Sequence, residues 1–205
     1  MGKLTLTSFL SLDGVMQAPG GPDEDRSGGF EYGGWLVPHF SPDMGAIMLD
    51  IFSRASALLI GRGTYDIFSA HWPTVTDPTD LVAHQLNTLP KFIASTTTRH
   101  FEWANSNHVA DVPADIEAIK NRFEGELQIH GSHGLAQTLI AHNLIEEYRL
   151  FIFPVALGKG KQLFGSIPAP VGLELIGARQ LSRGVTYNVY RPTHEFKTGS
   201  FPFGS

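Results

Sequence analysis

The sequence of 205 residues contains no cysteine. Disulfides, thiol nucleophiles, iron–sulfur clusters and cysteine-ligated zinc are therefore excluded. Basic residues are also few: 15 Lys and Arg stand against 20 Asp and Glu, a formal net charge of −5, and they form no Lys/Arg-rich block. A protein that binds nucleic acid through its phosphates needs such a cationic surface. We therefore expect no nucleic-acid partner.

Long apolar runs are missing as well. No run approaches the roughly 18 residues that a membrane span requires, and the amino terminus alternates polar and apolar residues, unlike a signal peptide. We therefore expect a cytoplasmic protein with no membrane partner. The length and the hydrophobic content of 42% are typical of one globular domain. We predict that this domain spans residues 1–192 and that residues 193–205 are a flexible tail or a remnant of expression.

The most informative stretch begins with the short apolar run Ala57–Ile60, which predicts a buried strand. Gly61-Arg62-Gly63-Thr64 follows and predicts a turn into a helix. The first N–H groups of a helix are free and its dipole favours negative charge, so this corner suits a phosphate. Arg62 adds a cation with fork geometry, and Thr64 adds a hydroxyl at the expected N-cap. Taken alone, such a turn more often only connects a strand to a helix and binds no ligand.

Two other strand ends resemble this corner. The strand predicted at Leu127–His130 leads through Gly131 and Ser132 into a helix. The strand predicted at Lys91–Ser95 ends in hydroxyl side chains. Glycine corners at the carboxyl ends of strands can face one ligand that carries two phosphates. The sequence therefore favours a dinucleotide site.

The remaining pattern alternates strands with amphipathic helices and predicts a mostly parallel sheet with helices on both faces. Ser41-Pro42-Asp43 is typical of a helix start. The last two strands, Glu174–Leu181 and Val185–Tyr190, are predicted to form an antiparallel hairpin. Before the first helix, the glycine-rich segment Val15–His39 is long for a compact domain, and its embedded aromatics favour a functional lid over disorder.

These features in this order resemble the dihydrofolate reductase-like superfamily. The resemblance covers residues 3–191, and the closest branch is the reductase domain of the bifunctional riboflavin-biosynthesis deaminase/reductase. It is carried by Ser11–Gly14, Gly61–Tyr65, Gly131-Ser132, Glu146–Val155 and Gly158–Phe164. The resemblance implies a three-layer α/β fold, NADPH as the cofactor, and pairing as a homodimer.

The resemblance also implies roles for single residues. Gly61, Arg62 and Thr64 would hold the cofactor phosphates, with Arg62 a candidate for the 2′-phosphate. The adenosine ribose would lie beside Ser95 and Thr96. The pyrophosphate would lie at the helix start, which comprises Gly131, Ser132 and Leu135.

One position departs from the riboflavin reductases, which usually carry a substrate-binding glutamate where this chain has His130. His130 is retained as a substrate-binding candidate. Its i, i+3 spacing from His133 also raises the alternative of a metal site, but no third ligand is near in sequence, so hydrogen-bonded histidines are favoured and no metal is expected. The absence of a deaminase segment also weakens the link to riboflavin synthesis.

Two further residues have alternative interpretations. Asp13 is the candidate catalytic acid, because hydride addition to a C=N bond needs a matched proton, with a cap of its own Asp-Gly turn as an equal alternative. Trp35 is a candidate to stack on a flat substrate ring, with a core position as the alternative. Lys159 and Lys161 either attract the anionic cofactor or form an exposed turn, and Glu147 is expected at a solvated end of its strand.

Three functions remain open. The first is an NADPH-dependent reductase of a flat nitrogen heterocycle, with a small-molecule substrate. The second is the 5-amino-6-(5-phosphoribosylamino)uracil reductase of riboflavin biosynthesis. The third belongs to another class: a nucleotide-binding protein without efficient turnover.

Overall fold

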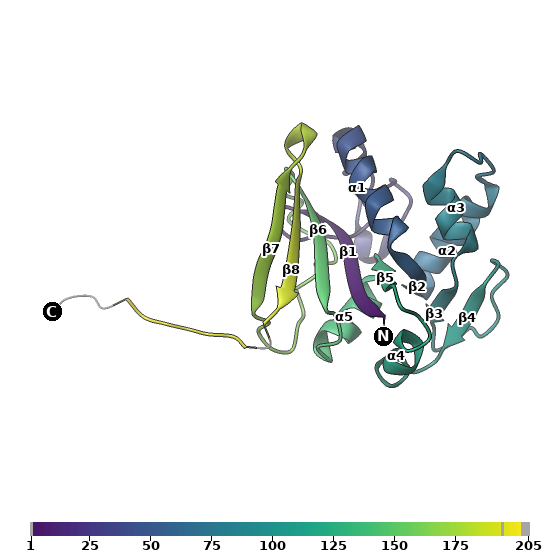
Figure 1. Cartoon of the computed structure of the whole chain (residues 1–205). Helices are drawn as coiled ribbons and strands as arrows, with labels where there is room; N and C mark the ends of the chain where they lie inside the picture. The colour runs from purple at the N-terminus through teal and green to yellow at the C-terminus, as the bar shows by residue number, and fades with distance from the viewer. Residues whose placement is uncertain (1, 194, 202–205) are drawn as a thin grey trace.

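The alternation of strands and helices builds one mixed sheet in the computed structural model, which describes residues 2–193 and 195–201 (Figure 1). Within these residues the sheet has eight strands in the order β4-β3-β2-β5-β1-β6-β8-β7. The strands are β1 (Lys3–Ser11), β2 (Ala55–Gly61), β3 (Lys91–Ala94), β4 (Ser106–Val109), β5 (Glu126–His130), β6 (Glu147–Phe153), β7 (Leu173–Gln180) and β8 (Thr186–Pro192). The helices are α1 (Pro42–Ser53), α2 (Arg62–His71), α3 (Leu81–Thr88), α4 (Val112–Lys120) and α5 (His133–Ala141).

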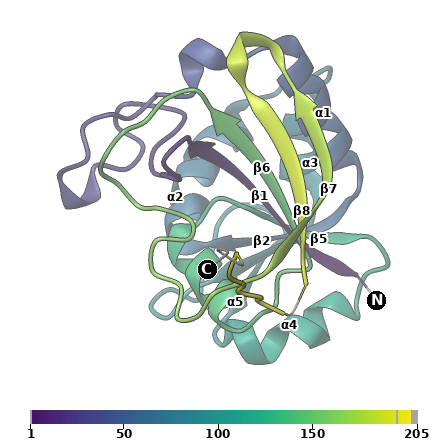
Figure 2. The same ribbon diagram turned by 90° about the vertical axis from the view of Figure 1, so that its left-hand side faces the viewer.

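The strands from β4 to β6 run parallel, as the crossover helices between them require. The hairpin β7–β8 joins this sheet antiparallel to β6, and Figure 2 shows these three strands side by side. The predicted parallel sheet and the predicted carboxyl-terminal hairpin are therefore both confirmed. Because β6 lies inside the sheet between β1 and β8, its apolar residues belong to the core of the chain itself.

The helices divide between the two faces of the sheet. Helices α4 and α5 pack on the face that carries Leu4, Leu6 and Leu127, while α1, α2 and α3 cover the opposite face (Figures 1 and 2). Successive side chains of a strand point to opposite faces, so the alternation along each strand decides which helix layer it meets. This arrangement is the expected three-layer α/β fold.

The face beneath α1 contains charged side chains as well as apolar ones. Arg149 on β6 is buried, and its guanidinium donates to both carboxylate oxygens of Glu126 at 2.7 and 2.6 Å. Arg149 also donates to Glu147 at 2.8 Å, and Lys3 pairs with the second oxygen of Glu147 at 2.5 Å. The expectation of a solvated Glu147 was wrong, because two cations compensate its charge inside the sheet.

The carboxyl-terminal residues 195–201 extend away from the domain (Figure 1). These residues are exposed and belong to no helix or strand. Residues 194 and 202–205 of the predicted tail lie outside the described residues, so its flexibility stays a prediction. No helix within the described part of the chain combines the length and the apolar character needed to cross a membrane.

Candidate functional site

A cavity of about 1480 Å³ opens at the carboxyl ends of the parallel strands. The segments that line it from the strand ends are Thr7–Phe9, Gly61–Thr64, Ala94–Thr97, Ala110–Pro113 and His130–Leu135. Ligands of open α/β sheets bind outside the carboxyl ends of the strands, where neighbouring crossovers diverge. The fold therefore brings the three strand ends that the sequence singled out to one cavity.

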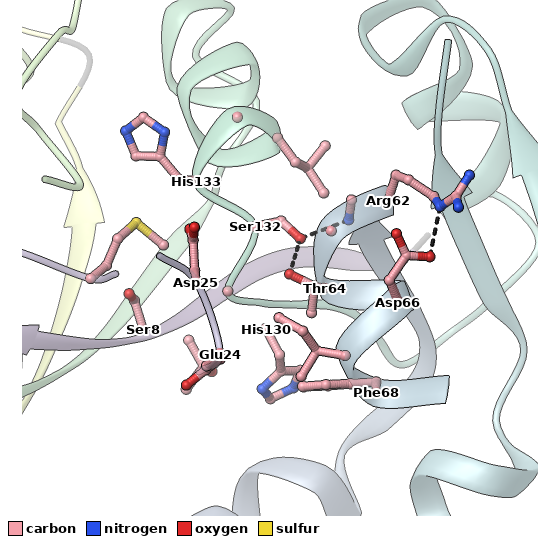
Figure 3. A pocket seen from close by; sticks show the side chains of 18 of the residues that line it. Ser8, Glu24, Asp25, Arg62, Thr64, Asp66, Phe68, His130, Ser132 and His133 are labelled. Atoms are coloured by element: carbon pink, nitrogen blue, oxygen red, sulfur yellow. Dashed lines mark hydrogen bonds and ion pairs between the residues drawn. The ribbon is translucent and has the colours of Figure 1, made fainter. Parts of the chain in front are cut away.

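The two glycine corners are joined directly. The backbone N–H of Gly61 donates to Ser132 Oγ at 2.8 Å, and Ser132 Oγ donates to Thr64 Oγ1 at 2.5 Å (Figure 3). A Cβ atom on Gly61 would lie 2.9 Å from Ser132 Oγ, so only glycine permits this approach. Gly131 has a φ of +68°, which is also favourable for glycine alone. The start of α2 and the start of α5 thus form one rigid wall.

The first corner differs in one detail from the prediction. Helix α2 begins at Arg62 with Gly61 as its N-cap, so Thr64 lies inside the first turn. The expected capping role of Thr64 was wrong, because the extended backbone of Gly61 already ends the strand one turn earlier. The Thr64 hydroxyl instead accepts the hydrogen bond from Ser132.

Arg62 lines the cavity with a half-exposed side chain. Its Nε donates to Asp66 Oδ1 at 2.7 Å, and Nη1 donates to the hydroxyl of Thr98. The Arg62 guanidinium is therefore held at the junction of α2 with the segment after β3. This placement suits recognition of a phosphate at the rim of the cavity.

The segment after β3 forms a hydroxyl-rich turn. Ser95 is buried, and its Oγ accepts hydrogen bonds from the N–H groups of Thr97 and Thr98 at 3.3 and 3.0 Å. Ser95 therefore shapes the turn, while the exposed Thr96 presents its hydroxyl at the cavity. Leu135 of α5 also reaches the cavity wall, but its side chain is mostly packed in the core beside α4.

His130 lies on the cavity wall at the end of β5. Its ring stacks on Phe52 with centroids 4.4 Å apart, and Nε2 lies 3.0 Å from Gln128 Oε1. Burial, and then the positive charge of Arg149, lowers the pKa of His130 to about 3, so the ring is neutral at physiological pH. Among the described residues, no group of three or more His, Asp or Glu side chains is arranged to hold a metal ion.

Asp13 does not line the cavity. Its carboxylate accepts hydrogen bonds from the N–H groups of Leu157 and Gly158, the shortest of them at 2.7 Å, and from the Ser11 hydroxyl at 2.6 Å. The Ser11 bond, followed by the Gly158 bond, lowers the pKa of Asp13 to about 2. A carboxylate that is ionised and held by backbone donors outside the cavity is a poor proton donor to a ligand there. The geometry therefore corrects the interpretation of Asp13 in favour of a structural role, and its catalytic role stays a prediction.

Asp13 offers a direct test of this correction. Asp13→Ala removes the acceptor for two backbone N–H groups and should lower the Tm by roughly 2–4 °C, while any NADPH oxidation should be retained. Asp13→Asn keeps one acceptor oxygen and should lose less stability. Differential scanning calorimetry and a spectrophotometric assay measure the two effects. Loss of turnover in Asp13→Asn at unchanged stability would restore the catalytic role.

Trp35 also belongs to the core. Its indole N–H donates to the Gln17 carbonyl oxygen at 2.8 Å, and its ring packs edge-on against Phe153 with centroids 5.4 Å apart. Only 8% of the residue is exposed, and it does not line the cavity. These contacts favour the core position of Trp35, because the indole anchors the glycine-rich segment to the sheet, and its stacking on substrate stays a prediction.

The glycine-rich segment is fastened over one side of the cavity by the segment that follows β6. Val15 forms an antiparallel bridge with Gln162, and Lys161 pairs with Asp25 at 2.6 Å. Lys159 donates to the Gly29 carbonyl oxygen at 3.3 Å. The two lysines thus tie the segment down, a role that neither sequence interpretation included.

Sequence reasoning missed two acids of this segment, Glu24 and Asp25, which line the cavity. Figure 3 shows them in the view between Ser8 of β1 and helix α2. Hydrogen bonds from Lys161 and Ser27 outweigh the effect of burial and lower the pKa of Asp25 to about 2. The sequence feature that could have identified them is their position as adjacent acids within Val15–His39, the segment already interpreted as a functional lid.

The opposite half of the cavity is largely apolar. Its wall comes mainly from α1, α2, α3 and the segment before α1. The apolar side chains there are Phe40, Met44, Met48, Phe52, Phe68 and Leu86. Within the described residues, the only Lys and Arg side chains that line the cavity are Arg62 and Lys161, and each already pairs with an aspartate. The cavity thus joins a wall of hydrogen-bond donors to an apolar chamber.

The architecture has a counterpart among known families. A model of the RibD C-terminal domain matches residues 2–187. The chain belongs to the RibD C-terminal domain family. The uncharacterized protein YyaP of Bacillus subtilis (strain 168) is 26% identical over 194 residues, which cover 92% of this chain and 94% of YyaP.

Solved structures support the fold of this RibD C-terminal domain. A proposed riboflavin biosynthesis protein from Shewanella sp. PV-4 has a TM-score of 0.70 and 22% identity, covering 93% of this chain and 99% of that one. A pyrimidine reductase-like protein from Corynebacterium diphtheriae has a TM-score of 0.61 and 11% identity, covering 95% of this chain and 93% of that one. Dihydrofolate reductase from Enterococcus faecalis, complexed with NADP(H) and RAB-propyl, has a TM-score of 0.60 and 14% identity, covering 94% of this chain and 97% of that one. The predicted dihydrofolate reductase-like fold is confirmed.

Proposed function

We propose that this RibD C-terminal domain is an NADPH-dependent reductase of a flat nitrogen heterocycle. The observation that carries the proposal is the junction of the two glycine corners, whose free helix N-termini face one cavity. A Cβ atom on Gly61 would clash with Ser132, and the positive φ of Gly131 favours glycine. A pyrophosphate that approaches the backbone closely requires residues without a side chain at such positions. Membership of a reductase family supports the same conclusion.

The residues of this chain would divide the cofactor between them. Gly61, Thr64, Gly131 and Ser132 would hold the phosphates at the two helix starts. Arg62 would take the 2′-phosphate at the rim. The bound dinucleotide would supply a hydride, and the protein would orient the substrate and exclude water from the apolar chamber.

The riboflavin-pathway reduction is the second candidate, and family membership favours it. Its substrate carries a phosphorylated sugar, which needs an anion site in addition to the one for the cofactor. Besides Arg62, which is assigned to the cofactor, Lys161 is the only Lys or Arg among the described residues that line the cavity. Its ammonium nitrogen lies 2.6 Å from a carboxylate oxygen of Asp25. The apolar wall therefore favours a substrate without a phosphate, and His130 in place of glutamate is a separate departure from the riboflavin reductases.

The test is NADPH oxidation against a panel of dihydropterin, dihydrofolate and the ribosylaminouracil phosphate. We expect oxidation with one of the unphosphorylated heterocycles. Oxidation with the ribosylaminouracil phosphate alone would favour the riboflavin reaction. Cofactor binding without oxidation of NADPH by any of the three would favour the nucleotide-binding alternative without turnover.

Arg62 gives a separate prediction about the cofactor. Arg62→Ala removes the rim guanidinium and should raise the Kd for NADPH roughly 10- to 100-fold, because a charge-assisted hydrogen bond contributes about 1.5–3 kcal/mol. The Kd for NADH, which lacks the 2′-phosphate, should change little. Fluorescence titration measures both constants.

The matched control is Arg99→Ala, which removes an exposed cation that does not line the cavity. It should leave both affinities unchanged. Equal losses of NADPH and NADH binding in Arg62→Ala would show that Arg62 does not distinguish the two cofactors.

A further inference from the structure

The described residues that line the cavity include five carboxylates: Glu24, Asp25, Asp66, Asp80 and Asp111. Four of them have other tasks. Asp25 and Asp66 form ion pairs at 2.6 and 2.7 Å with Lys161 and Arg62. Asp80 and Asp111 are N-caps, which accept hydrogen bonds from the first turns of α3 and α4. An ionised carboxylate with such partners is a poor proton donor.

Glu24 differs from these four. Its Oε2 accepts hydrogen bonds from the N–H groups of Gly20 and Gly21, at 2.6 and 3.2 Å. No hydrogen bond reaches Oε1 within the described residues, and no Lys or Arg there pairs with this carboxyl group. A protonated carboxyl group fits this geometry, since its carbonyl oxygen can accept both N–H groups while the other oxygen carries the proton.

The surroundings of Glu24 favour the neutral form. Burial outweighs the two backbone hydrogen bonds and raises the pKa of Glu24, and the negative charge of Asp25 acts in the same direction. Lys161, on the segment after β6, is neutralised by Asp25. His130 on β5 and His133 on α5 have lowered pKa values, chiefly through burial, so neither adds a positive charge at neutral pH. Arg62 on α2 is likewise paired with Asp66, so among the described residues no cation forms an ion pair with Glu24.

We propose that Glu24 is the acid that protonates the ring nitrogen of the substrate. This assignment rests on the proposed reductase function. In the balanced step, the carbon of a substrate C=N bond receives the hydride from the reduced nicotinamide nucleotide, and the nitrogen receives the proton from Glu24. The π pair of the C=N bond becomes the new N–H bond. Glu24 is left as a carboxylate and recovers its proton from solvent.

The same geometry defines the class of ligand. A neutral acid on a loop above an apolar chamber fits an uncharged, weakly basic heterocycle, because a ring nitrogen accepts the proton while the flat ring occupies the apolar wall. A permanent anion in the substrate would instead lie on the side of the cavity that carries Asp25, whose partner Lys161 is already paired with it. Substrate recognition and proton donation thus fall on one residue.

The first experiment needs no substrate. The chain is labelled with ¹³C in the side-chain carboxyl of glutamate, and the Glu24 signal is identified by its absence in Glu24→Gln. An NMR titration is then recorded in the presence of saturating NADP⁺. We expect Glu24 to titrate above its ordinary value of about 4.5. A midpoint below 4.5 overturns the assignment.

The second experiment measures the reaction. For a panel compound that wild type reduces, Glu24→Gln should lower the rate of hydride transfer about 100-fold or more, the usual contribution of a general acid, with the NADPH Kd unchanged. The wild-type rate should fall as pH rises through the Glu24 pKa, and Glu24→Gln should lose this dependence. Gln keeps the oxygen that accepts from Gly20 and Gly21, so a merely structural role predicts little change.

The matched control is Glu31→Gln, an exposed glutamate on the same segment that does not line the cavity. It should retain the wild-type rate and pH profile. Glu24→Gln with a wild-type rate and profile overturns the role of Glu24 while the reductase function stands. If wild type oxidises NADPH with no compound of the panel, the reductase function fails, and the NMR midpoint then decides separately whether Glu24 is an acid.

Discussion

Gly61→Val is expected to raise the Kd for NADPH by at least about 100-fold. A Cβ atom at this position would lie 2.9 Å from Ser132 Oγ and 3.0 Å from Ser132 Cβ, so the added methyl groups force α2 and α5 apart. The hydrogen bond from the Gly61 N–H to Ser132 would be lost with the close approach. Because two helix N-termini must face the same pyrophosphate, separating them removes donors that no other segment replaces.

The overpacking should also lower the free energy of unfolding by about 1–3 kcal/mol. Isothermal titration calorimetry measures the affinity, and urea denaturation followed by circular dichroism measures the stability. Comparing both values shows whether the folded fraction of the variant binds the cofactor. Gly61→Val that binds NADPH as tightly as wild type would contradict the assignment of this wall.

Gly63→Ala, two residues further along the chain, is the control for the effect on stability. A Cβ on Gly63 meets no atom within 4 Å, and the residue lies in the first turn of α2. Alanine is favoured over glycine in a helix by up to about 1 kcal/mol, so this variant should be as stable as wild type or slightly more stable.

Arg149→Met is expected to lower the free energy of unfolding by about 3–5 kcal/mol. The substitution keeps much of the side-chain volume but leaves Glu126 without its bidentate partner beneath α1. Glu147 would retain only Lys3. An uncompensated buried charge costs far more than the ion pair contributes, which explains the size of the effect. Urea denaturation at neutral pH measures it.

The loss should depend on pH. In the native protein, burial raises the pKa of Glu126 and Glu147, but their bonds to Arg149 and Lys3 outweigh burial and lower both pKa values. Their stabilising contribution is therefore present above about pH 4.5, the unfolded value, and is lost as pH falls through the lowered native values. Removing Arg149 removes the cause of that shift, so the difference in the free energy of unfolding between wild type and Arg149→Met should shrink as pH falls below about 4.5.

Arg54→Met is the control for this prediction. Arg54 also contacts Glu126, at 3.3 Å, but its side chain is 40% exposed. Its loss should cost no more than about 1 kcal/mol, as for other surface ion pairs. Equal losses in the two arginine variants would show that burial of Arg149 is not what makes its pair important.

Local patterns were enough to predict the frame of the protein and part of the cavity wall. Strand ends followed by glycine and a helix start are short-range features, so Gly61, Arg62, Gly131 and Ser132 could be grouped on one wall from their neighbours alone. The resemblance to dihydrofolate reductase-like proteins rested on the same features in order. The alternation along the strands likewise predicted the layers, because it depends only on the period of a strand.

The tertiary structure decided the roles that depend on which distant groups meet. The sequence around Asp13 and Trp35 suggested a role at the site for both residues. In the folded chain, however, backbone N–H groups after β6 bind the Asp13 carboxylate, while the Gln17 carbonyl and the Phe153 ring contact the Trp35 indole. Glu24 is one acid among several in a polar loop until the fold places it on the cavity without a cation. Burial and partners determine the charge of a side chain, and both are properties of the folded chain.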